Sequence, residues 1–216
     1  MAYISNIIFA FVLAIAIFFF RRNILFIKRN IQLGQAIDRS DRSSERWSNM
    51  LRIALGQSKM VNRPIAGILH IIVYVGFIVI NIELVEIVLD GLLGTHRMFA
   101  PYMGEVYNFF IALFEILALL VLVSVILFWL RRNALKIKRF WKSEMKGWPK
   151  NDADYILYFE IVLMTLFLSM NATDQLLQEL GEPHYTQAGL FPVSKFMTPL
   201  FSSFSTTKLV MLERSF

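Results

Sequence analysis

Five ionisable residues lie inside long apolar runs of this 216-residue sequence: His70, Glu83, Glu86, Glu115 and Glu160. Titratable side chains are costly in a bilayer, so those that occur there usually bind an ion or a ligand, or move protons. A neutral imidazole can ligate a metal. A carboxyl group in lipid binds its proton more tightly than one in water, so it can exchange that proton near neutral pH. These residue types favour redox or proton chemistry inside a membrane.

His70 has helical neighbours that suit a flat ligand. Gly67, Tyr74 and Phe77 precede it by three positions or follow it by four and seven, so they share its face of a helix. A haem needs an imidazole ligand, a small residue beside the macrocycle and apolar or aromatic walls. This stripe predicts haem ligation by His70, with Arg63 near the membrane surface as the partner of a haem propionate. The alternative is a hydrogen bond from His70 to a neighbouring helix or to a quinone.

The other two histidines cannot complete a site at His70. His96 follows it by 26 residues, or roughly 39 Å along a straight helix, and His184 lies in the C-terminal tail. A second axial ligand would therefore come from outside this chain, unless the iron is five-coordinate or absent. His96 and His184 either hold a separate haem, line a quinone pocket or are solvated. Glu160, at about the depth of His70, is a candidate to orient the His70 ring by a hydrogen bond.

The acidic residues of the second apolar run form a stripe of their own. Glu83, Glu86 and Asp90 are spaced i, i+3 and i+7, and a helical turn of about 100° per residue puts them roughly opposite His70. Glu115 on the third run lies at a depth comparable with Glu83. We expect these two glutamates to share a proton or to flank a quinol, and the alternative is ordinary hydrogen bonding between helices.

Long helices must position these residues. The chain is 56% hydrophobic and 18% charged, with 20 Phe, whereas soluble domains are about 45–50% apolar and about 25% charged. A water-soluble globule is therefore excluded. A bilayer core needs about 20 helical residues, and the apolar runs that approach or exceed this length are 2–20, 64–88, 106–130 and 155–170. Since an open chain crosses lipid only as helix, we predict an all-α bundle of four transmembrane helices in a single domain, 1–216.

Basic residues predict the orientation of this bundle. Ten Lys and Arg residues lie in segment 21–63 and eight in 131–154, but only four lie on the other two flanks. By the positive-inside rule both basic loops are cytoplasmic, and the N-terminus and the tail 174–216 are outside. The net charge of +6 then reflects topology and anionic lipid, and we expect no nucleic-acid partner.

Shorter segments flank the spans. We expect residues 23–33 to extend the first helix as far as Gly34, and residues 47–55 to form a basic, amphipathic helix at the inner membrane surface. That helix is either simply solvated or a docking point for a cytoplasmic electron-transfer domain. Residues 174–180 suit a helix on the outer surface, ended by Gly181. Residues 209–212 begin a further apolar run, from which we expect a fifth crossing to follow.

The sequence resembles the N-terminal membrane domain of the membrane-bound (Fe–S)-binding oxidoreductases. The residues that carry the resemblance are 54–60, Arg63, Pro64, Gly67, His70, Tyr74, Gly76 and Phe77, with 94–97 and 181–184. Such proteins resemble a nitrate reductase gamma subunit fused to a heterodisulfide-reductase-like iron–sulfur domain. The resemblance implies a five-span, cytochrome-b-like unit that carries haem b on His70 and exchanges electrons with menaquinone or ubiquinone. Because the chain has no cysteine, the Fe–S clusters would lie in a cytoplasmic domain or subunit.

The predicted function is therefore the membrane part of a quinone-linked iron–sulfur oxidoreductase in a bacterial inner membrane. It would pass electrons between quinone and the cytoplasmic clusters, as part of an enzyme rather than as a complete catalyst. The alternative is a non-redox anchor or assembly subunit that docks a cytoplasmic partner through its two basic loops.

Overall fold

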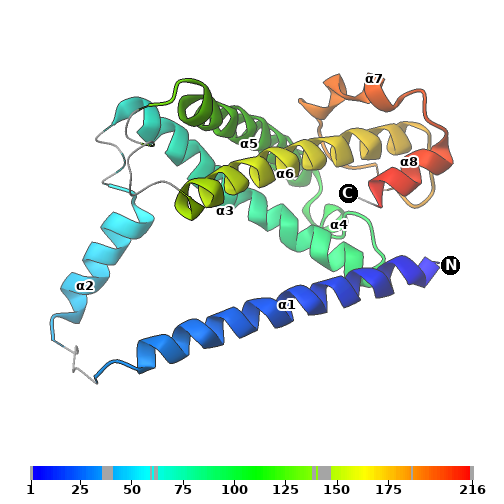
Figure 1. Cartoon of the computed structure of the whole chain (residues 1–216). Helices are drawn as coiled ribbons and strands as arrows, with labels where there is room; N and C mark the ends of the chain where they lie inside the picture. The colour runs from blue at the N-terminus through cyan, green and yellow to red at the C-terminus, as the bar shows by residue number, and fades with distance from the viewer. Residues whose placement is uncertain are drawn as a thin grey trace.

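The computed structural model describes residues 2–35, 41–58, 60, 63–137, 140, 147–185 and 187–214. Every regular element in these ranges is helical (Figure 1). The four long helices are α1 (Ala2–Gln32), α3 (Pro64–Leu93), α5 (Glu105–Trp129) and α6 (Trp148–Glu179). Each is apolar and long enough to cross a membrane, with the third candidate span continuing to Ala134. The prediction of an all-α chain with four helices that could span a membrane is confirmed for the described residues.

Helix α6 is longer than the sequence predicts. Its 32 residues measure about 48 Å at 1.5 Å per residue, whereas the apolar run covers only 155–170. The separate surface helix expected at 174–180 is wrong, because these residues are the last turns of α6 and its cap. Asp174 is only 3% exposed there, so the polar residue that suggested a surface helix instead faces the interior of the protein.

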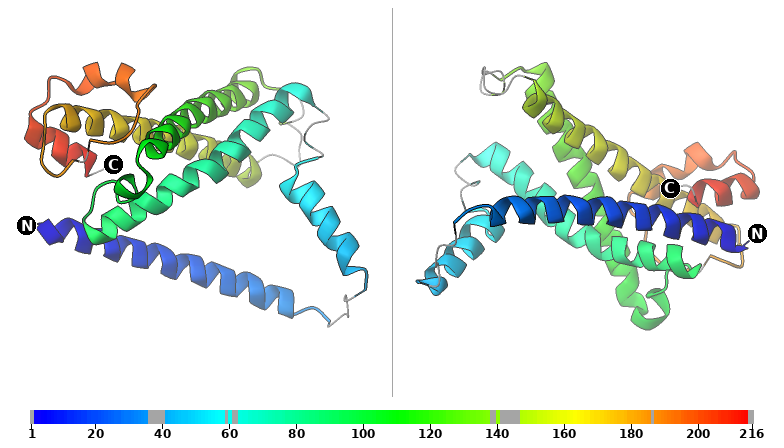
Figure 2. Two further views of the ribbon diagram at one scale, coloured as in Figure 1. Left: turned by 180° about the vertical axis from the view of Figure 1, so that it is seen from behind. Right: turned by 60° about the horizontal axis from the view of Figure 1, so that its bottom comes forward.

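The connections between helices gather at the two ends of the bundle. Both chain termini and the α3–α5 connection, which contains α4 (Ala100–Met103), lie at one end (Figures 1 and 2). Helix α2 (Ser43–Met50), continued by the π-helix η1 (Leu51–Leu55), lies toward the opposite end. This arrangement agrees with the predicted topology. We name the end with the termini the outer end after the predicted orientation, which stays a prediction. The short helix expected over 47–55 is confirmed, as is the extension of the first helix to Gln32.

Helix α5 lies at the centre of the packing. Helices α3 and α6 both pack along it, and its residues Ile111, Ala118 and Val125 are almost fully buried. Gly76 lets α3 approach closely, since a Cβ at this position would collide with the Val121 side chain. The face of α3 with Gly76, Glu83 and Glu86 is therefore the face that packs inward.

The tail folds back over the outer half of α6. It contains η5 (Ser194–Phe196), α7 (Thr198–Phe201) and α8 (Thr206–Glu213), which all contact α6. Leu177, Tyr185 and Leu209 form a small hydrophobic core between them. The apolar run that begins at Leu209 thus packs on the bundle as far as the structure describes it, through residue 214.

Candidate functional site

A cleft of about 640 Å³ lies at the outer end, where α1, α3, α5, α6 and the tail meet. Its volume falls in the range of about 300–1,000 Å³ typical of small-molecule sites. The chemically active residues that line it are Glu83, Glu86, Asp90, His96, Arg97, Asp174, His184 and Glu213. Three of the residues predicted for proton or quinone chemistry, Glu83, His96 and His184, are therefore brought together in one place.

A buried ion pair forms the floor of this cleft. The Arg97 Nε donates to Asp174 Oδ2 at 2.7 Å, and a second guanidinium nitrogen lies 2.6 Å from the same oxygen. Burial alone would lower the pKa of Arg97, but the Asp174 carboxylate more than offsets this and holds that pKa above its ordinary value. Arg97 also donates to the Tyr107 hydroxyl at 3.2 Å and to Asn171 Oδ1 at 3.3 Å. One cation thus joins the α3–α5 connection to both α5 and α6.

The two histidines meet above the ion pair. The His96 Nε2 lies 3.0 Å from Asp174 Oδ1, so the carboxylate fixes the orientation of this ring. The His96 and His184 ring centroids are 6.2 Å apart, and the Tyr185 ring is 4.8 Å from that of His96. Burial, His96 and Arg214 together lower the pKa of His184. His184 is therefore neutral near pH 7 and can accept a proton.

Glu83 and Glu86 differ in their hydrogen bonding, although both are buried. Glu86 accepts a hydrogen bond from the Phe99 amide and another from the Tyr107 hydroxyl, each 2.8 Å long. Among the described residues, Glu83 Oε2 has no hydrogen-bond partner, although Glu83 is only 3% exposed. A buried carboxyl oxygen without a partner is costly, so it marks a group kept for a ligand or a proton.

Glu115 binds the C-terminal tail through hydrogen bonds. Its Oε2 accepts hydrogen bonds from the amides of Val193, at 2.9 Å, and Ser194, at 3.2 Å, and its Oε1 accepts one from the Ser194 hydroxyl. Sharing of a proton with Glu83, or binding of a quinol between the two glutamates, stays a prediction. The alternative of plain hydrogen bonding is present, and the partner is the tail rather than another helix.

The residues around His70 do not form a complete haem site. His70 and Tyr74 are half-buried and Gly67 is buried, but Arg63 is exposed and Phe77 is 60% exposed. His70 lies about 120° around α3 from Gly76, so its stripe is turned away from the packed face. The other two histidines of the chain, His96 and His184, line the cleft at the outer end. Ligation of haem by His70 therefore stays a prediction.

No group of three or more His, Cys, Asp or Glu residues among the described residues could hold a metal ion. Among the described residues, no hydrogen bond joins His70 to Glu160, and orientation of the His70 ring by Glu160 stays a prediction. Among the described residues near His70, Arg63 and Phe77 are exposed, so they do not enclose a ligand on their own.

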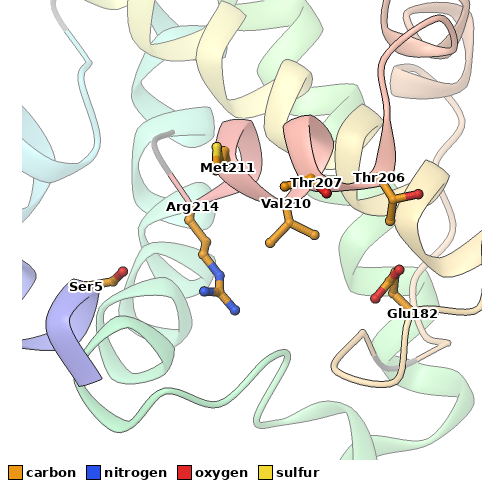
Figure 3. Close-up of a pocket in the computed structure, with 7 residues that line it drawn as sticks. All are labelled: Ser5, Glu182, Thr206, Thr207, Val210, Met211 and Arg214. Atoms are coloured by element: carbon orange, nitrogen blue, oxygen red, sulfur yellow. The ribbon is translucent and has the colours of Figure 1, made fainter. Parts of the chain in front are cut away.

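A second and more open pocket of about 600 Å³ adjoins the cleft and shares Ser5 and Arg214 with it. Figure 3 shows Arg214, at the end of α8, extending into the pocket between Ser5 of α1 on one side and Glu182 on the other. The Tyr185 hydroxyl donates to Glu213 Oε2 at 2.9 Å, which ties α8 to the segment after α6. Helix α8 thus covers the outer side of the cleft.

Sequence reasoning missed the ion pair of Arg97 and Asp174, which are 77 positions apart. Arg97 is one of only four Lys or Arg residues on the outer flanks. Asp174 follows directly on an apolar run. A lone basic residue and a lone acidic residue at the same predicted depth are the signal by which the pair could have been found.

We compared the chain with models of protein families, with curated proteins and with solved structures, and found no match in any of the three comparisons. The resemblance to the (Fe–S)-binding oxidoreductases therefore stays a prediction. What the protein does has to be inferred from the chemistry of the cleft.

The lowered pKa of His184 makes the stability depend on pH. The folded chain binds this proton less tightly than the unfolded chain, so the stability is fully present above pH 6.5 and is lost as the pH falls. We expect His184→Asn to lose less thermal stability than the wild type between about pH 7.5 and about pH 5.5. Unfolding midpoints in detergent at the two pH values measure this. Equal losses in both proteins would show that protonation of His184 is not coupled to folding.

Proposed function

We propose that this chain is the quinone-binding membrane part of an electron-transfer complex, and that the cleft at the outer end is its quinone site. The observation that carries the proposal is the Glu83 carboxyl group, which is buried beside the cleft with one oxygen unpartnered. It stands in the same cleft as His184, a second group suited to accept a proton.

The lining of the cleft matches the shape and polarity of a quinol. A quinol ring carries hydroxyl groups at opposite ends and an apolar tail. Glu83 and His184 offer acceptors for two hydroxyl protons, while Phe9, Ile87 and Met170 provide apolar contacts. The Arg97–Asp174 pair holds His96 in place and keeps a positive charge in the floor of the cleft. These features supply a polar end for the ring and an apolar side for the rest of the molecule.

The proposed reaction releases two electrons and two protons from each quinol, or takes up the same number in the reverse direction. The Glu83 carboxylate and the neutral His184 ring accept the protons, which is general-base work. The electrons pass one at a time to an acceptor of the haem or iron–sulfur class, which lies outside the residues that the structure describes. The non-redox anchor stays as the alternative, and it predicts no quinone binding in this cleft.

Binding of a tail-free quinone to the full chain in lipid nanodiscs tests the proposal. We expect Glu83→Leu to weaken binding by about tenfold or more, equivalent to about 1.4 kcal/mol. The same change should raise the unfolding midpoint, because it removes a buried carboxyl group that has an unsatisfied oxygen. Isothermal titration calorimetry and thermal unfolding in the same preparation measure both effects.

Glu160→Leu is the matched control for this experiment. Glu160 is also a carboxylate on a membrane-spanning helix, but it does not line the cleft. It should leave quinone affinity unchanged. A photoreactive quinone should label peptides that contain residues 83–97 or 170–184. The proposal is wrong if the wild type binds no benzoquinone or naphthoquinone, or if the label spreads evenly over the helices. In either case the non-redox anchor is the better hypothesis.

A further inference from the structure

The cleft has one apolar side, and this side faces the seam between α1 and α3. Phe9 from α1 and Ile87 and Gly91 from α3 line it there. The two helices lie together at the outer end and diverge toward the opposite end (Figures 1 and 2). The other sides are closed by the Arg97–Asp174 pair and by α8. A molecule held in the cleft therefore has apolar surroundings in only one direction, along membrane-spanning helices.

Helix α1 contacts α3 over only its first turns. Its half-buried residues are Asn6, Phe9, Ala10 and Leu13, a helical stripe, whereas every residue from 14 to 32 is exposed. The Asn6 Nδ2 donates to the Gly91 carbonyl oxygen at 2.8 Å. The Phe9 ring lies directly on Gly91, since a Cβ there would be 2.8 Å from Phe9 Cε1. The Asn6 hydrogen bond and the contact of the Phe9 ring with Gly91 thus both lie in the seam.

We propose that the seam between α1 and α3 holds the isoprenoid tail of the quinone, and that the Phe9–Gly91 contact decides which tails are accepted. This inference rests on the proposed function and adds the place where the tail of the quinone lies and the contact that selects it.

Below Gly91, Ile87 and Leu84 continue the same face of α3, four and seven positions back. Ala10 and Leu13 continue the stripe on α1. All four are apolar, so a tail that leaves the cleft past Phe9 meets only hydrocarbon surfaces. Lipid is as apolar as the seam, so a tail held there gains affinity from close packing against these side chains rather than from leaving water.

The test compares two ligands with the same quinone ring, one without a tail and one with a long isoprenoid tail. Both ligands are titrated into the wild type and into the Gly91→Ala variant, each as the full chain in nanodiscs. In the variant the added methyl group collides with the Phe9 ring. We expect the long-tailed quinone to bind about tenfold more weakly, and the tail-free quinone to bind as in the wild type. Val85→Leu, on an exposed part of α3, should change neither affinity.

The double variant Phe9→Ala with Gly91→Ala tests whether the weaker binding comes only from displacement of α1 by the new methyl group. Removing the ring makes room for the new methyl group and keeps the Asn6 hydrogen bond, so affinity for the long-tailed quinone should return. Equal weakening of both quinones by Gly91→Ala, or no weakening of either, would overturn the tail path and leave the quinone site intact. If the wild type fails to bind the tail-free quinone, the proposed function itself is wrong.

Discussion

Asp174→Ala is expected to lower the free energy of unfolding by about 3–5 kcal/mol, because it leaves the Arg97 guanidinium buried without its carboxylate. Both side chains are less than 10% exposed, and Asp174 also accepts hydrogen bonds from the Gln178 amide and from His96. The change therefore leaves several polar groups unpaired at once. Chemical unfolding of the purified chain in detergent, followed by circular dichroism, measures the loss.

Two controls separate loss of the pair from loss of any carboxylate. Asp152→Ala removes an exposed acidic residue at the opposite end of α6 and should change the unfolding free energy by less than about 0.5 kcal/mol. The double variant Asp174→Leu with Arg97→Met removes both charges. It should be more stable than Asp174→Ala, since an apolar pair leaves no buried charge without a partner. If Asp174→Ala behaves like Asp152→Ala, the pair does not hold the cleft together.

The helices of this chain are predictable from its sequence wherever hydropathy alone decides them. The bounds of α3 and α5 follow the apolar runs closely, because lipid leaves the backbone no alternative to helix. Helix α6 is the exception. Its last turns carry Asn171, Thr173 and Asp174. Arg97 donates to Asn171 Oδ1 and pairs with Asp174, and the Thr173 hydroxyl donates to a backbone carbonyl one turn back. A pairing over 77 positions leaves no trace in a local pattern.

The candidate site was predictable in its residue types but not in its assembly. Glu83 and the two other histidines, His96 and His184, are recognisable as unusual in a membrane protein. Their meeting depends on the reversal of the chain at Gly181, whose φ of +72° suits glycine, and on the docking of the tail. For His70 the residue types predicted a site, but the surroundings of the stripe in the fold could not be predicted from its composition. In the stripe with the composition of a haem pocket, Gly67 is buried, His70 and Tyr74 are half-buried and Phe77 is exposed.

Docking of the tail depends on Glu115, and Glu115→Leu should release it. Glu115 is fully buried and accepts hydrogen bonds from two backbone amides and one hydroxyl. Each buried donor left without an acceptor costs about 1–3 kcal/mol, so we expect several kcal/mol of local stability to be lost. Limited proteolysis should then cut within 187–205 at least tenfold faster than in the wild type. Mass spectrometry of the fragments locates the cuts.

Glu105→Leu, an exposed glutamate at the start of the same helix, should leave the tail protected. Ser194→Ala removes only the hydroxyl donor and should accelerate cleavage less than Glu115→Leu. Release of the tail also carries away His184 and Glu213, which line the cleft from its outer side. The Glu115→Leu variant should therefore lose quinone binding although Glu115 does not line the cleft. Slow cleavage with intact binding would show that the outer wall of the cleft is held by the α6–α8 packing instead.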